Sequence, residues 1–202
     1  FSSALREDMK KIYADVMKYF VAFCVFIFLG IAMYPELFAL LLGKSFRSGI
    51  SVLPIMLVAN ILLGVVFNLS MWYKLSDKTH YALTITLLGL GINLVINVLF
   101  MPVYGLMAAA WGYLLSYLSM VVFSYYLSRR YYPIPYDTKT ILLYFGSGIA
   151  VYLLSVLLAP ESLALRILLN TLYIITFVFL VLKHEHIDMR RIKSLLIKSE
   201  PH

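Results

Sequence analysis

The sequence contains few charged residues, and its long apolar runs contain almost none. Aspartate, glutamate, lysine and arginine together make up 13% of the 202 residues, whereas hydrophobic residues make up 62%. The mean hydropathy is +0.89. Since an average soluble domain carries about 25% charged residues, this composition excludes a soluble globular domain and predicts an integral membrane protein.

Residue groupings that carry covalent catalysis or bind metals are also scarce. The apolar runs contain no aspartate, lysine or histidine, and the chain has no phosphate-binding loop of the GxxxxGK[ST] type. Cys24 is the single cysteine and cannot form an intramolecular disulfide. His184, Glu185 and His186 are adjacent in sequence, and no further ligands accompany them to complete a tetrahedral metal site. We therefore expect no enzymatic activity, no metal site and no cofactor.

The apolar residues form six continuous runs: Tyr19 to Leu42, Ile50 to Tyr73, Tyr81 to Phe100, Leu106 to Leu127, Ile141 to Leu158 and Leu163 to Leu182. Each run is close to the ~20 residues with which a helix crosses the hydrocarbon core of a bilayer. Transmembrane β-strands would instead alternate apolar and polar residues in segments of about ten. The predicted fold is therefore all-α, with six transmembrane helices in a lipid bilayer.

Basic residues concentrate on one side of the predicted membrane. If the N-terminus is cytoplasmic, all of the 17 basic residues lie on the cytoplasmic side except Lys44, Arg47 and Arg166. Because cytoplasmic loops of membrane proteins are enriched in lysine and arginine, we predict that both ends of this segment are cytoplasmic. The net charge of +7 then reflects topology and attraction to anionic lipids rather than binding of nucleic acid.

Two successive runs carry small and amide side chains at four-residue spacing: Asn60, Gly64 and Asn68, then Gly89, Asn93 and Asn97. Residues four apart share one helical face, and a carboxamide in a membrane is unfavourable unless it finds a partner. We interpret Asn60, Asn68, Asn93 and Asn97 as walls of a substrate cavity, in which facing stripes satisfy one another and leave some amide groups for a ligand. The alternative is that the stripes only hold helices together.

The fourth run carries a pattern that indicates packing rather than chemistry. Ala108, Gly112 and Ser116 form a series of small residues at four-residue spacing, and such a series lets the backbone of another helix approach closely. Trp111 and Tyr113 flank the series and are typical of a membrane interface.

The chain divides into five segments by charge and proline content. We predict a cytoplasmic amphipathic lead-in at 1–18, a four-helix group at 19–128, an interfacial joint at 129–140, a terminal helical hairpin at 141–182 and a basic cytoplasmic tail at 183–202. Two prolines forbid a regular helix in the joint. The hairpin is poorer in polar residues, which indicates a lipid-facing accessory. The tail suits a helix on the cytoplasmic leaflet, and a frayed charged tail is the alternative.

Several stretches of the chain resemble the bacterial polysaccharide biosynthesis flippases, which belong to the multidrug/oligosaccharidyl-lipid/polysaccharide exporter superfamily. The stretches that carry the resemblance are Arg47 to Gly49, Val52 to Ile55, Ala59 with Asn60, Asn68 to Thr79, Asn97 with Pro102, Tyr104 with Gly105, Ala108 to Trp111 and Tyr131 to Tyr136. The resemblance implies a MATE-like fold in which this chain holds the last six spans, so that an N-terminal lobe of the same protein is missing.

The resemblance also implies a function. It implies that the parent protein flips an undecaprenyl-diphosphate-linked oligosaccharide across the bacterial cytoplasmic (inner) membrane for O-antigen, capsule or exopolysaccharide assembly, with a polysaccharide polymerase and glycosyltransferases as further partners. Lys74, Lys78, Arg129 and Arg130 at the cytoplasmic mouth are the candidates to contact the diphosphate, and solvated topology charges are the alternative reading of these residues. Two other functions stay open: a cation-coupled multidrug exporter of the same superfamily, and a structural membrane subunit that transports nothing.

Overall fold

The computed structural model describes residues 2–35 and 49–185. Within these ranges the chain forms helices and connections without strands, and the helices are α1 (Ser2–Ala32), α3 (Leu53–Leu69), α4 (Met71–Leu75), α5 (His80–Tyr104), α6 (Leu106–Tyr131), α7 (Thr138–Leu157) and α8 (Leu163–His184). Six helical stretches are long and apolar enough to cross a membrane. The predicted all-α fold with six membrane-spanning helices is therefore confirmed.

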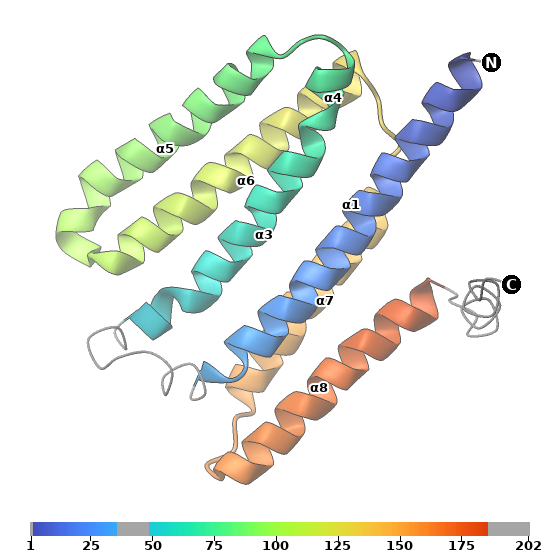
Figure 1. Ribbon diagram of the computed structural model, residues 1–202. Coiled ribbons are helices and arrows are strands. Elements are labelled where there is room, and N and C mark those ends of the chain that lie inside the picture. Colours follow the sequence, from blue (N-terminus) through green and yellow to red (C-terminus); the bar gives the residue numbers. More distant parts are fainter. Residues whose placement is uncertain (1, 36–48, 186–202) are drawn as a thin grey trace, which may run out of the picture.

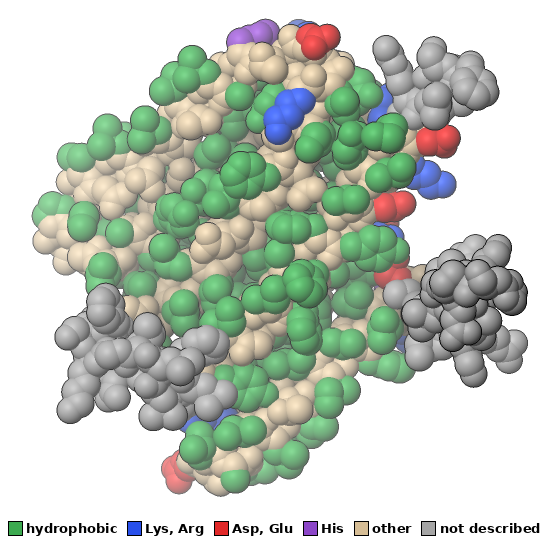
Figure 2. Space-filling model, viewed as in Figure 1, with side chains coloured by type: hydrophobic (Ala, Val, Ile, Leu, Met, Phe, Trp, Pro, Cys, Tyr) green, Lys and Arg blue, Asp and Glu red, His purple; other side chains and the backbone are tan. Residues whose placement is uncertain are grey.

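The long helices lie side by side, and successive ones run in opposite directions (Figure 1). One end of the bundle carries the start of α1, helix α4, the start of α5 and the connection between α6 and α7. We call it the N-terminal end. Figure 2 shows charged side chains gathered near the ends of the helices, with a broad hydrophobic band between them. This distribution is what a protein surrounded by lipid requires.

The first helix is longer than the sequence analysis predicted. Residues 1–18 were expected to form a separate lead-in, but α1 runs without a break from Ser2 to Ala32. The reason is local, because residues 2–29 contain neither glycine nor proline to interrupt the helix. The remainder of the predicted first span, the loop with Lys44 and Arg47, and the tail beyond residue 185 lie outside the described residues.

The second span and the joint after α6 also differ from their predicted limits. The second span is broken at Ser70, where α3 ends and the short α4 begins, and the Ser70 hydroxyl donates to the carbonyl of Phe67. The joint is non-helical only between α6 and α7, at 132–137. It is shorter than predicted because Asp137 caps α7 by accepting a hydrogen bond from the Thr140 amide.

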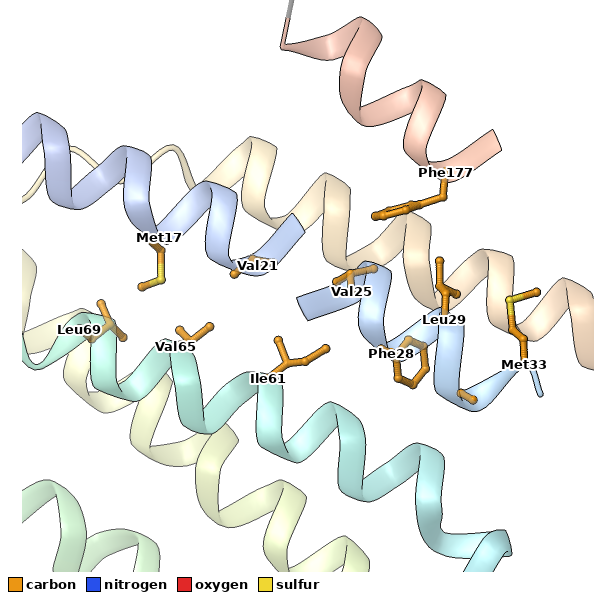
Figure 3. Packing of buried hydrophobic residues seen from close by; sticks show 11 residues of the cluster. Met17, Val21, Val25, Phe28, Leu29, Met33, Ile61, Val65, Leu69 and Phe177 are labelled. Atoms are coloured by element: carbon orange, nitrogen blue, oxygen red, sulfur yellow. The ribbon is translucent and has the colours of Figure 1, made fainter. Parts of the chain in front are cut away.

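The helices pack as two groups of three that meet along α1 and α3. In one group α6 contacts both α3 and α5, and in the other α1 contacts both α7 and α8. Buried apolar side chains of α1 and α3 face one another where the groups meet, and Phe177 of α8 points toward α1 from the other side (Figure 3). The predicted hairpin, α7 and α8, is therefore packed on α1, and apolar side chains on its outer surface, such as Leu157 and Phe179, are exposed.

Close backbone approach occurs at two glycines that face α1. A β-carbon at Gly64 of α3 would overlap the ring of Phe20, and a β-carbon at Gly148 of α7 would overlap the Val25 side chain. At Gly148 a larger residue would push α7 away from α1, because the short Val25 side chain has little room to move, whereas at Gly64 the Phe20 ring would have to turn aside.

Candidate functional site

Three of the four predicted cavity asparagines donate hydrogen bonds within their own helices. Asn60 donates to the carbonyl of Met56 at 2.9 Å and Asn68 donates to that of Gly64 at 3.1 Å. Asn97 donates to both the carbonyl and the side-chain oxygen of Asn93, at 2.8 and 3.0 Å. The expectation that facing stripes satisfy one another is therefore wrong for these three amides, because the preceding turn of the same helix provides the acceptor.

The two stripes do not face each other because α6 packs against both α3 and α5. The stripe of α5 meets the small residues of α6 instead. The Ser116 hydroxyl donates to the carbonyl of Gly89 at 2.7 Å, and the amide nitrogen of Asn97 lies 3.1 Å from where a β-carbon of Gly112 would be. Ala108, Gly112 and Ser116 are all buried. The prediction that they form a packing face is thus confirmed.

A hollow of about 420 Å³ lies between α3, α5 and α6, and we call it the amide groove. Its polar lining residues are Tyr73, Thr86, Asn93, Tyr113, Ser116 and Tyr117, and the remaining lining residues are apolar. None of the side chains that line it carries a formal charge. Asn93 accepts a hydrogen bond from Asn97, and its own amide nitrogen donates to no residue in the described ranges. The groove therefore offers amide and hydroxyl groups to a neutral polar ligand.

The four predicted cavity asparagines are thus not equivalent. Only Asn93 is among the residues that line the amide groove. Asn60 is exposed and Asn68 is half-buried on α3, and Asn97 is half-buried against α6. The structure brings one of the four to the groove and leaves the other three bonded to their own helices.

Two of the four predicted cationic residues gather around a cluster of aromatic rings at the N-terminal end. Trp72 is fully buried and stacks on Tyr131, with ring centroids 6.1 Å apart. The Tyr81 hydroxyl donates to that of Tyr131 at 2.9 Å. Lys78 Nζ lies 3.6 Å from the centroid of the Tyr131 ring, and the Arg130 guanidinium lies 5.7 Å from it. These cations are held by cation–π contacts to one tyrosine.

The other two predicted cations lie elsewhere. Arg129 projects beside the Tyr125 ring at 6.0 Å and lines a different hollow, together with the joint after α6. Lys74 is exposed on α4. Consecutive residues of a helix point in different directions, so Arg129 and Arg130 cannot both face one ligand of small size. The structure therefore divides the four predicted cations between separate places and does not gather them into one binding site.

A polar network that the sequence analysis missed ties the end of α8 to α1 and α7. Lys18 Nζ donates to one carboxylate oxygen of Glu185 at 2.7 Å, and the Tyr144 hydroxyl donates to the other at 2.6 Å. Burial opposes ionisation of Glu185, but the hydrogen bonds from Lys18 and Tyr144 outweigh it and lower the pKa of the carboxyl group. The partners are 167 residues apart, so no local pattern could have revealed this ion pair.

Asn170 forms a second bridge of this kind at the opposite end of α8. Its amide nitrogen donates to the carbonyl of Met33 at 2.6 Å, and its side-chain oxygen accepts from the Ser155 hydroxyl at 2.8 Å. Asn170 is only 4% exposed. Since it joins α8 to α7 and to the end of α1, its function is structural.

Comparison of the chain with protein-family models, with curated proteins and with solved structures finds no match. Within the described ranges, histidine, cysteine, aspartate and glutamate form no group of three that could hold a metal ion.

Proposed function

We propose that the chain is part of a membrane transporter that moves an undecaprenyl-diphosphate-linked oligosaccharide across the bacterial cytoplasmic membrane for cell-surface polysaccharide assembly. The amide groove is the observation that supports this proposal most directly. It lies among membrane-spanning helices, it is lined by uncharged hydrogen-bonding groups, and the amide nitrogen of Asn93 has no partner among the described residues.

A sugar suits such a groove for energetic reasons. Hydroxyl groups of a sugar can exchange hydrogen bonds with amide and phenol groups, and no fixed charge has to be desolvated as the ligand enters or leaves. Aromatic rings such as Tyr113 and Tyr117, whose centroids are 4.6 Å apart, supply apolar surface for the C–H faces of a sugar ring. In this proposal the amide groove forms one wall of the sugar path, and the missing N-terminal lobe forms the facing wall.

The remaining parts of the proposal concern orientation and partners. With the N-terminal end on the cytoplasmic side, Lys78 and Arg130 at the Tyr131 ring lie where the diphosphate of the lipid carrier would begin its passage. The polymerase and glycosyltransferases that make and extend the oligosaccharide would then act on either side of the same membrane. The resemblance in sequence described above supports these points.

Replacing Asn93 by leucine in the full-length protein tests the role of the groove. Loss of a hydrogen bond to the moving sugar should reduce polymer export about tenfold, which corresponds to about 1.4 kcal/mol, while the amount of protein in the membrane stays unchanged. Surface polymer and membrane abundance are measured in the same cells.

Asn60→Leu is the matched control, because Asn60 is exposed and does not line the groove. It should leave export near the wild-type level. Equal loss of export and of abundance in Asn93→Leu would show that the asparagine is structural and would contradict the proposal. Export that is unchanged in Asn93→Leu would contradict it as well.

A further inference from the structure

A second hollow at the N-terminal end combines an apolar part with a polar part. The apolar part, which we call the lipid groove, has a volume of about 290 Å³ and is lined by side chains of α1, α3, α6 and α7. The polar part, which we call the interfacial pocket, has a volume of about 840 Å³ and lies under the joint at 132–137. Tyr125, Tyr136 and Thr138 line both, so the two parts are adjacent.

The lipid groove is open toward the side of the bundle. Three of its lining residues, Leu118 and Val122 of α6 and Leu142 of α7, are 43, 61 and 63% exposed. Its inner wall is made of α1 and α3, where Met17 and Val21 point toward the side chains of Ile61, Val65 and Leu69 (Figure 3). A chain in the surrounding lipid can therefore enter between α6 and α7 without crossing a polar barrier.

The length of the lipid groove matches one leaflet of the bilayer. From Ile61 to Leu69, the α3 residues that line it span about 12 Å at 1.5 Å per residue. Half of a hydrocarbon core is about 15 Å thick. An acyl chain whose headgroup sits at the N-terminal end would thus lie in the groove over most of its own leaflet.

The interfacial pocket presents positive charge at the mouth of the groove. Its acidic residues are already engaged: Glu7 pairs with Lys10 at 2.9 Å, and Asp137 accepts hydrogen bonds from the amide and hydroxyl of Thr140. Arg129 and Lys139 also line the pocket, and neither forms an ion pair with a described residue. The charged residues that line the pocket, Glu7, Lys10, Arg129, Asp137 and Lys139, carry a net charge of +1, which favours an anion at the membrane surface.

A buried hydroxyl group marks the point where the two parts meet. The Tyr136 hydroxyl oxygen is inaccessible to solvent and has no hydrogen-bond partner in the described part of the chain. A buried hydroxyl without a partner is unfavourable. Because this oxygen has no exposed surface, Tyr136 contributes its ring and not its hydroxyl to the lining of the two parts.

We propose that the lipid groove and the interfacial pocket together bind one anionic phospholipid of the surrounding leaflet. One acyl chain lies between α6 and α7, and the phosphate lies at Arg129 and Lys139. A phospholipid fits better than a free phosphate because the groove is apolar along the whole of its length. This binding site is distinct from the amide groove and does not depend on the transport function proposed above. Its role is to fill the space between α6 and α7, the helices that the joint connects.

Native mass spectrometry of the full-length protein, titrated with phosphatidylglycerol, phosphatidylcholine or undecaprenyl phosphate, tests the proposal. We expect phosphatidylglycerol to bind more tightly than the other two. Arg129→Gln combined with Lys139→Gln should raise the Kd for phosphatidylglycerol about 30-fold, since each basic residue near an anionic headgroup contributes roughly five- to sixfold. Lys11→Gln combined with Lys183→Gln removes two exposed cations outside the pocket and should change the Kd less than threefold.

A second pair of variants tests the acyl chain. Leu142→Trp should fill the entrance of the lipid groove and weaken phosphatidylglycerol binding about tenfold. Leu157→Trp, on an exposed part of the same helix away from the groove, should leave binding unchanged. Equal binding of phosphatidylglycerol and phosphatidylcholine, or equal effects of the pocket variants and their controls, would overturn the proposal. Tighter binding of undecaprenyl phosphate would also overturn it, because the occupant would then be a polyprenyl chain.

Discussion

The two groups of helices hold themselves together by different means. In the group of α3, α5 and α6, the amides of Asn60, Asn68 and Asn97 bond within their own helices, and close contact comes from small residues such as Gly112 on α6. In the group of α1, α7 and α8, Asn170 is an asparagine that bridges three helices. The same side chain thus bonds only within its own helix in one group and bridges helices in the other.

The difference has a physical consequence for function. Removing Asn170 or the ion pair of Lys18 with Glu185 breaks bonds between helices, whereas the three amides of the other group form none. In that group the hydroxyls of Ser116 and Tyr81 bond α5 to α6 instead. The group of α3, α5 and α6 also carries the amide groove. We therefore interpret α1, α7 and α8 as a unit joined by polar bridges, beside which the groove-bearing helices are joined by small residues and hydroxyl hydrogen bonds.

The largest loss of stability should come from a bulky side chain placed in the contact between α1 and α7. In Gly148→Val the new side chain overlaps Val25, which should lower the free energy of unfolding by about 3 kcal/mol through overpacking. Thermal unfolding of the detergent-solubilised protein measures it. Gly146→Val is the control, because nothing lies within 4 Å of a β-carbon there. Equal behaviour of the two variants would show that α7 is not packed tightly on α1.

The next largest loss of stability should distinguish the asparagine that bridges helices from an asparagine that bonds within its own helix. Asn170→Leu leaves the Met33 carbonyl and the Ser155 hydroxyl without their partner, which should lower the free energy of unfolding by about 2 kcal/mol. Asn60→Leu should change it by less than about 0.5 kcal/mol, because Asn60 is exposed and bonds only to its own helix. The same unfolding assay measures both variants. If both lose the same amount, the contrast between the groups is wrong.

The smallest effect should appear as a dependence of stability on pH. The pKa of Glu185 is lowered in the folded protein, below the ordinary value of 4.5. Its ion pair with Lys18 therefore stabilises the fold above that value, and the contribution of about 1 kcal/mol is lost as the pH falls through the folded pKa. Unfolding is measured at pH 7 and at several lower values. Glu185→Gln should be less stable at pH 7 and should lack this acid-induced loss.

The local sequence pattern was sufficient to predict where the helices lie in the chain, but not which helices pack against one another. The predicted start of the fourth span at Leu106 and of the sixth at Leu163 match the starts of α6 and α8, because glycine and proline precede them and hydrophobicity sets the length of a span. The start of α1 was missed because its polar first turns are as helical as the apolar turns that follow. Small-residue spacing identified the packing face of α6, since that signal is confined to one helix.

For the candidate sites too, residue spacing was informative within one helix and uninformative between helices. The four-residue spacing correctly placed Asn93 and Asn97 on one face of α5, but it could not show that α6 packs against both α3 and α5 and prevents the two stripes from meeting. Nor could it show that Arg129 lines the interfacial pocket while Arg130 lies at the Tyr131 ring, because that depends on which elements lie on each side of α6.

The sequence by itself determined that this protein is a helical membrane protein, because continuous apolar runs of this length are stable in lipid only as helices that satisfy their own backbone. Only the tertiary structure decided which polar side chains are available to a ligand. An asparagine in a membrane bonds to the nearest acceptor that its helix and its neighbours provide, and those neighbours are brought together by contacts between residues as distant as Lys18 and Glu185.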